Sequence, residues 1–115
     1  WRSLGDTFQS VQGHAPADPL DAPGEADLTA HVDFEALARA AAPAAHTHPI
    51  PQGAFLQRLG VEARAEALAR NLYGPERESH LAAYRRLTGA EEMGTVFQVL
   101  GIHPSGTAPP PGTDP

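Results

Sequence analysis

Carboxylates are concentrated in the first third of the chain, and they provide its first candidate chemistry. They are Asp6, Asp18, Asp21, Glu25, Asp27 and Asp33. Two interpretations are open. In the structural one, these side chains are solvated loop carboxylates and helix caps. In the functional one, they form an acidic rim that binds a cationic group, such as a guanidinium, through charge-assisted hydrogen bonds.

Histidines provide a second candidate chemistry. His46 and His48 are separated by one residue, so an extended strand would place both imidazoles on one side, where they could bind a metal ion. A metal site needs a further ligand, and the adjacent sequence offers none, so we expect a solvated loop and no metal. His14 and His103 have no patterned partner, and we expect them at the surface or capping backbone groups. The chain contains no cysteine, which excludes a thiol nucleophile, a disulfide scaffold and a zinc ribbon.

The composition further narrows the kinds of partner that the protein could bind. The 115 residues contain eight arginines, no lysine and fourteen acidic residues, for a net charge of −6. This balance argues against a nucleic-acid partner, because no basic stripe is present to neutralise phosphates. No apolar run approaches the roughly 20 residues that cross a bilayer. We therefore expect a soluble, cytoplasmic chain without a membrane partner, and the replacement of lysine by arginine suggests a bacterial origin.

The segment around Asp27 and Asp33 has to position the carboxylates named above. Asp27 or Thr29 could close a turn through side-chain-to-backbone hydrogen bonds. Asp33 is a favourable N-cap for a helix over residues 34–42, which Pro43 would end. Both roles are architectural and compete with the functional interpretation of the same side chains.

Apolar spacing predicts three more helices in the middle of the chain. They cover residues 52–59, 61–73 and 75–89, with Gly60 as a C-terminal stop and Pro75 in a first helical turn. Gln52 is expected to tie its loop to a helix. The predicted strands are 7–11 and 95–100, with at most a short extended segment within 43–51 and a loop over 13–24. Residues 104–115 have the composition of a disordered tail.

The two strands lie at opposite ends of the chain, and large apolar side chains are few. A strand as apolar as residues 95–100 needs neighbours on both sides, and the chain offers at most two candidates. We therefore expect a fragment of a larger α/β domain.

Several runs of residues, in one order, resemble the C-terminal portion of the MidA-like S-adenosylmethionine-dependent methyltransferases. The runs are GDTFQSV (5–11), PGEADLTAHVDF (23–34), QGAFL (52–56) and MGTVFQVL (93–100). The resemblance covers roughly residues 5 to 103. The family includes a mitochondrial arginine methyltransferase that assists the assembly of respiratory complex I.

The resemblance implies an α/β fold: the C-terminal part of a Rossmann-like class I methyltransferase sheet, helix-rich and with few strands. Residues 1–103 would be this portion, with 43–51 as the sixth strand and 95–100 as the last, antiparallel strand. S-adenosylmethionine would be bound mainly by the missing N-terminal half of the domain. The substrate would be a protein arginine, with a complex I subunit as a candidate partner. On the substrate side we expect His14, Asp27 and Asp33, and we expect the fragment alone to be inactive.

An alternative from another class remains. The chain could be a non-catalytic helical module that presents Leu68, Leu72, Leu81 and Tyr84 to a partner protein. The reading frame upstream of Trp1 distinguishes the two, since a glycine-rich loop after a strand there would favour the enzyme.

Overall fold

The computed structural model describes residues 8–13, 15–18, 20–21 and 24–115 and divides the chain into two compact units. Unit 1 is Trp1–Ala40 and unit 2 is Ala41–Pro115. Each unit is described by itself. Because His14 lies outside the described residues, its expected place at the surface or near a substrate stays a prediction.

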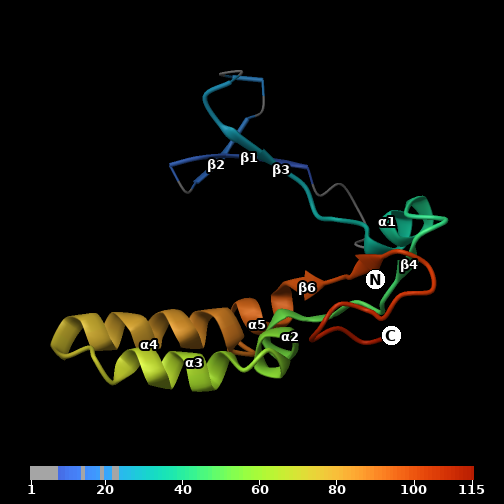
Figure 1. Ribbon diagram of the computed structural model, residues 1–115. Coiled ribbons are helices and arrows are strands. Elements are labelled where there is room, and N and C mark those ends of the chain that lie inside the picture. The colour runs from blue at the N-terminus through green and yellow to red at the C-terminus, as the bar shows by residue number, and fades with distance from the viewer. Residues whose placement is uncertain (1–7, 14, 19, 22–23) are drawn as a thin grey trace. The chain divides into compact units, whose positions relative to one another are not determined.

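Unit 1 contains a small antiparallel sheet of three strands in the order β2-β1-β3 (Figure 1). β1 is Gln9–Gln12, β2 is Ala15–Ala17 and β3 is Asp27–Thr29. Gly13 has a φ of 56°, a left-handed conformation that suits the tight turn between β1 and β2. The strand expected over 7–11 is therefore present but shifted, and the expected loop over 13–24 contains a strand of its own.

Helix α1, Phe34–Ala40, completes unit 1. Its first turn is capped by Asp33, whose Oδ1 accepts a hydrogen bond from the Ala36 amide at 3.0 Å. The predicted N-terminus is thus confirmed, and the helix ends two residues before the predicted Ala42.

Unit 2 is built on four helices: α2 (Gln52–Arg58), α3 (Val61–Ala69), α4 (Gly74–Thr88) and the short α5 (Met93–Val96). α3 and α4 lie side by side as a hairpin (Figure 1), and α2 contacts α3, α4 and α5. Gly60, with a φ of 80°, separates α2 from α3, and Pro75 lies in the first turn of α4. Both predicted helix boundaries, at Gly60 and Pro75, are confirmed. However, α3 ends at Ala69 rather than near Tyr73.

Two short antiparallel ladders join the segments on either side of these helices. β4 (Ala45–His46) pairs with β7 (Ile102–His103), and β5 (Ile50–Pro51) pairs with β6 (Gln98–Val99). The extended segment expected within 43–51 is thus two short strands. These strands pair antiparallel with the last two strands of the chain.

The prediction of a strand over residues 95–100 is wrong for the first half of that range. Residues Met93–Val96 form α5, and the strand β6 is only Gln98–Val99. The physical reason is a close approach to the end of α4, since the Gly94 amide donates to the Gly89 carbonyl at 3.0 Å. A Cβ on Gly94 would lie 2.1 Å from the Thr88 carbonyl oxygen, so glycine is required at this position. β6 is half-buried rather than covered on both faces.

Residues 104–115 are folded against unit 2 instead of forming the expected disordered tail. The Asp114 carbonyl accepts a hydrogen bond from the His48 amide at 3.0 Å, and Arg58 donates to the Asp114 carboxylate at 2.6 Å. Gly112 lies close to Phe55 of α2 and to Leu59, the C-cap residue of that helix. Composition predicted disorder because the segment is rich in proline and glycine, but those residues form turns that direct it back onto α2.

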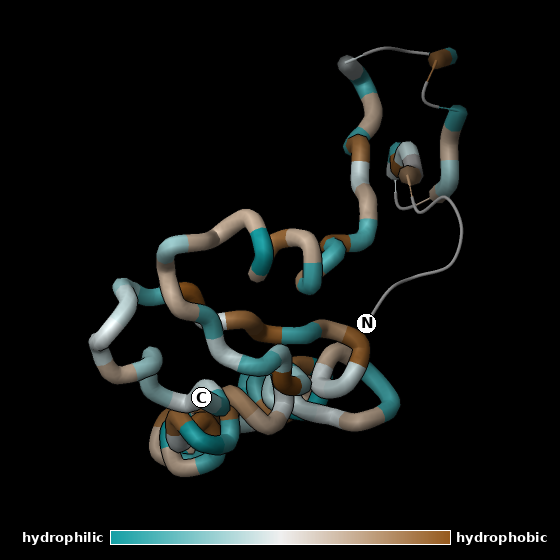
Figure 2. The backbone as a smooth tube through the Cα atoms, turned by 90° about the vertical axis from the view of Figure 1, so that its right-hand side faces the viewer, coloured by the Kyte–Doolittle hydropathy of each residue, from teal (hydrophilic) through white to brown (hydrophobic). Residues whose placement is uncertain are grey.

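The apolar core is small, as the scarcity of large side chains suggested. Among the described residues, the buried hydrophobic side chains are Ile50, Ala65 and Ala69. Hydrophobic stretches of the backbone are short and separated by hydrophilic ones (Figure 2). Within the described part of the chain, no helix has the length and apolar character that crossing a membrane requires. The structure is therefore α/β with helices and small antiparallel sheets, and the described residues contain no parallel strands.

Candidate functional site

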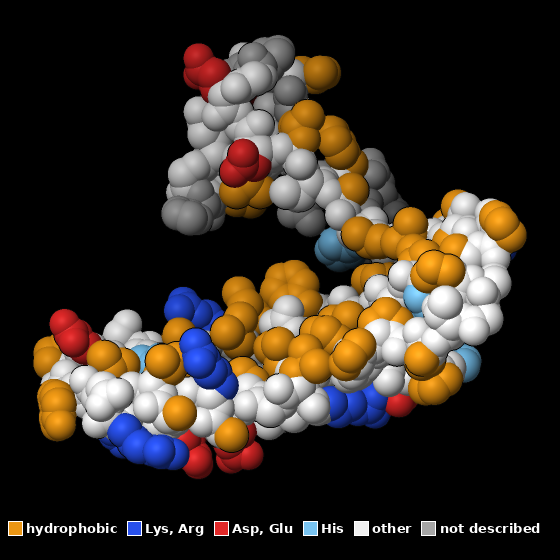
Figure 3. Space-filling model, in the orientation of Figure 1, with side chains coloured by type: hydrophobic (Ala, Val, Ile, Leu, Met, Phe, Trp, Pro, Cys, Tyr) orange, Lys and Arg blue, Asp and Glu red, His pale blue; other side chains and the backbone are white. Residues whose placement is uncertain are grey.

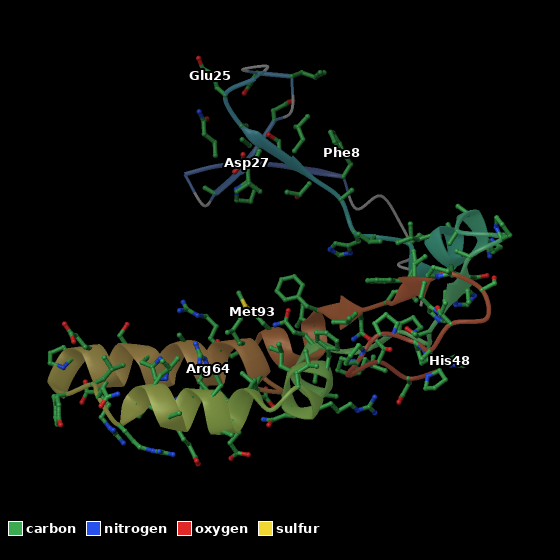
Figure 4. The ribbon with its side chains drawn as sticks, viewed as in Figure 1. Phe8, Glu25, Asp27, His48, Arg64 and Met93 are labelled. Carbon is green, nitrogen blue, oxygen red and sulfur yellow. The ribbon has the colours of Figure 1, made fainter. Side chains whose placement is uncertain are left out.

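Asp27 is the exposed first residue of β3, and it lies opposite Val11 of β1. Side chains alternate along a strand, so Asp27 and Thr29 lie on one face of the sheet and Leu28 on the other. Leu28 is itself exposed. Glu25 lies in the segment leading into β3, and the two labelled carboxylates lie apart (Figure 4). Asp27 thus lies in a strand rather than a loop, and it is exposed for contact.

Other carboxylates of unit 1 have architectural roles. Asp18 Oδ1 accepts a hydrogen bond from the Leu20 amide at 2.8 Å, which closes a turn. Asp33 caps α1, as described above, and its backbone carbonyl accepts from the Leu37 amide at 3.0 Å. The structural interpretation is confirmed for these two residues. Asp6 and His14 lie outside the described residues, and the structure does not bring Asp27 and Asp33 into one described contact.

His46 and His48 flank Thr47, whose side chain is buried while both imidazoles are on exposed residues. His48 Nδ1 lies 2.7 Å from the Pro115 carbonyl oxygen, and His46 Nδ1 lies 3.1 Å from the Thr47 carbonyl oxygen. Across the described residues, no three His, Asp or Glu side chains gather closely enough to hold a metal ion. Both histidines therefore contact the backbone.

Gln52, at the start of α2, ties two parts of unit 2 together. Its side-chain amide donates to the Leu87 carbonyl near the end of α4 at 2.9 Å, and its backbone amide donates to the Phe97 carbonyl at 2.9 Å. The structural role expected for Gln52 is confirmed.

Two shallow hollows lie on unit 2. The first has a volume of about 280 Å³ and lies where α4 meets α5. The second, of about 190 Å³, lies between α3 and α4, where Leu68, Tyr84 and Leu87 contribute to its lining. The surface inside both hollows is mainly apolar, although Arg86, Glu91 and Glu92 border the first one. Both hollows are therefore suited to packing against another surface rather than to acid–base chemistry.

In unit 2, Arg58 and Asp114 form an ion pair at 2.6 Å. The pKa of the Asp114 carboxyl lies below its ordinary value, chiefly because Arg58 donates a hydrogen bond to it. Desolvation opposes the shift, and the positive charges of Arg58 and His48 add to it. Sequence reasoning missed this pair, since 56 residues separate its members and neither lies in a motif.

Comparison with known proteins identifies a consistent set of relatives. Residues 2–50 match the model of a family described as "Putative S-adenosyl-L-methionine-dependent methyltransferase". The protein arginine methyltransferase NDUFAF7 homolog, mitochondrial, of Drosophila melanogaster is 40% identical over 102 residues, which cover 86% of this chain and 23% of the relative. The human protein arginine methyltransferase NDUFAF7, mitochondrial, is 38% identical over 101 residues, again 86% of this chain and 23% of the relative. The chain thus spans less than a quarter of the length of these relatives.

Proposed function

Because the chain belongs to the MidA-like family of S-adenosylmethionine-dependent methyltransferases, we propose that it is the C-terminal portion of an enzyme that methylates arginine in a protein substrate. The observation that carries this proposal is the 40% identity, over 86% of the chain, to a relative named a protein arginine methyltransferase. The antiparallel pairing of β4 and β5 with β7 and β6 supports it, since the resemblance implies an antiparallel final strand.

The described residues do not fit S-adenosylmethionine. Ligand pockets usually have volumes of roughly 300–1,000 Å³ and enclose most of their ligand. The larger hollow of unit 2 has only about 280 Å³ and is shallow, and no glycine-rich turn follows a described strand. We therefore propose that the cofactor binds in the part of the parent protein outside these residues, and we assign no step of the methyl transfer to this chain.

The role proposed for this chain is to bind and orient the substrate. Asp27 is the best placed of the described candidates, because it is exposed on β3 and can accept hydrogen bonds from a guanidinium. His14 is proposed for the same side of the substrate. Asp33 is a weaker candidate, since its Oδ1 already caps α1. A subunit of respiratory complex I is the proposed substrate class, and the cytoplasm remains the proposed location.

The test uses the parent protein that carries this chain. It is incubated with S-adenosylmethionine labelled in the methyl group and with an arginine-containing peptide, and the products are hydrolysed for amino-acid analysis. We expect label in methylarginine, and we expect Asp27→Asn to raise the KM for the peptide while the Kd of the cofactor stays unchanged. Glu62→Gln is the control, because Glu62 is an exposed carboxylate of α3 in the other unit.

Two results would overturn the proposal. Label that appears in lysine or in no amino acid would exclude arginine methylation. A calorimetric titration showing that the 115-residue chain alone binds S-adenosylmethionine at micromolar concentrations would exclude the proposed division of labour between the chain and the rest of the parent.

The non-catalytic module remains the second candidate, because the hollow between α3 and α4 is lined by Leu68 and Tyr84 as that reading requires. Leu72 and Leu81 are only half-buried. The reading frame upstream of Trp1 separates the two candidates, since the module has no need of a cofactor loop there.

A further inference from the structure

The surface where α4 meets α5 combines exposed apolar side chains with charges of both signs. We call it the α4–α5 patch. Its residues are Arg86, Glu91, Glu92, Met93, Val96 and Phe97, which line the hollow of about 280 Å³.

Two large apolar side chains at the centre of the patch are unusually exposed. Val96 is 73% exposed and Phe97 is 49% exposed, although both are large apolar residues. Met93 projects outward from the start of α5 (Figure 4), and Figure 3 shows hydrophobic side chains forming a band over this face of unit 2, with arginine side chains beside it. Exposed apolar surface that is contiguous and bordered by charges is typical of an interaction site.

The charges of the patch are not neutralised within the described part of the chain. The ion pairs in the described part of the chain are Arg39–Glu35 and Arg58–Asp114, and neither involves a residue of the patch. Arg86 lies in the last turn of α4, whereas Glu91 and Glu92 lie in the turn that leads into α5. A single hollow thus has a cationic side chain and two carboxylates on its border.

We propose that the α4–α5 patch binds the same patch of a second copy of this chain, with two-fold symmetry. A two-fold interface has to be self-complementary, because the same surface contributes on both sides. In the proposed dimer, Arg86 of each copy would face Glu91 and Glu92 of the other, and Val96 and Phe97 would pack at the centre. A partner with charge of one sign would leave either Arg86 or the two carboxylates unmatched at the interface, which is unfavourable.

The first test is sedimentation velocity of the 115-residue chain over a range of concentrations. We expect a monomer–dimer equilibrium. Arg86→Glu is expected to raise the dimer dissociation constant about tenfold, since the reversal acts twice across the axis. The combined variant Arg86→Glu, Glu91→Arg, Glu92→Arg restores opposite charges and is expected to recover the dimer. Arg70→Glu is the matched control, because Arg70 is an exposed arginine outside both hollows.

The second test uses the absence of cysteine from the chain. Val96→Cys places one thiol at the centre of the patch, and a short bis-maleimide is expected to join two copies. Tyr73→Cys is the control, because Tyr73 is 79% exposed at the N-cap of α4, outside both hollows. Circular dichroism of each variant establishes that the helices are retained.

Several outcomes would overturn the proposal. A chain that stays monomeric at all concentrations would show that the patch does not bind a second copy. Equal cross-linking of the Val96→Cys and Tyr73→Cys variants, or a dimer that Arg86→Glu leaves intact, would place the interface elsewhere. Failure of the combined charge swap to recover the dimer would exclude the pairing of Arg86 with Glu91 and Glu92.

Discussion

Thr47 and Gly101 exchange hydrogen bonds across the two ladders of unit 2. The Thr47 amide donates to the Gly101 carbonyl at 2.9 Å, and the Gly101 amide donates to Thr47 Oγ1 at 2.9 Å. Thr47 is only 1% exposed, so this pair lies in the interior. It joins the segment containing β4 and β5 to the segment containing β6 and β7, at the point where the two ladders meet.

Thr47→Val tests the importance of this pair. Valine keeps the shape of the side chain but removes the acceptor, which leaves the buried Gly101 amide without its partner. We expect a loss of about 1–3 kcal/mol in the free energy of unfolding, measured by urea denaturation. Ser79→Ala, at an exposed position in α4, serves as control and should change the free energy little. A Thr47→Val variant as stable as the native chain would contradict this account.

Gly94→Ala tests the close approach of α5 to α4. The added Cβ would lie 2.1 Å from the Thr88 carbonyl oxygen and 2.6 Å from that of Gly89, and neither backbone group can move freely. We expect a loss of roughly 3 kcal/mol or more. Gly60→Ala is the comparison, since it has open space but a φ of 80°, and the left-handed conformation should cost about 1–2 kcal/mol. Thermal unfolding should rank the two variants in this order.

Asp33 can be tested for a role beyond its N-cap. Asparagine is also a good N-cap, whereas alanine is not, so Asp33→Ala should destabilise α1 by about 1 kcal/mol and Asp33→Asn should not. Hydrogen exchange of the Ala36 amide, which donates to Asp33 Oδ1, reports on this cap. If Asp33 also orients substrate through its charge, Asp33→Asn will reduce the activity of the parent protein without faster exchange at Ala36.

The ion pair of Arg58 with Asp114 should make the attachment of residues 104–115 dependent on pH. The folded-state pKa of Asp114 lies below its unfolded value, so the stabilisation is present above the unfolded pKa and is lost as the pH falls through the folded pKa. An NMR titration of the Asp114 carboxyl carbon should give a low pKa, and Arg58→Ala should raise it towards the ordinary value. A pKa that Arg58→Ala leaves unchanged would show that another group causes the shift.

Local signals in the amino-acid sequence were sufficient to locate most helix boundaries. Asp33, Gly60 and Pro75 act on the residues next to them, through a cap, a left-handed turn and a missing amide, and all three lie where the patterns placed them. The runs GDTFQSV, PGEADLTAHVDF, QGAFL and MGTVFQVL, in this order, also indicated the methyltransferase family. The role of Asp27 in binding substrate remains a proposal, because its exposed position on a strand does not by itself show a function.

Contacts between distant residues followed from tertiary packing instead. Gly94 is required because the carbonyls of Thr88 and Gly89 approach it, which converts part of an apolar run into α5. Residues 104–115 are held by Arg58, His48 and α2, although their composition is typical of disorder. A local pattern records what a residue can do to its neighbours in the chain, whereas these contacts depend on which segments fold against one another.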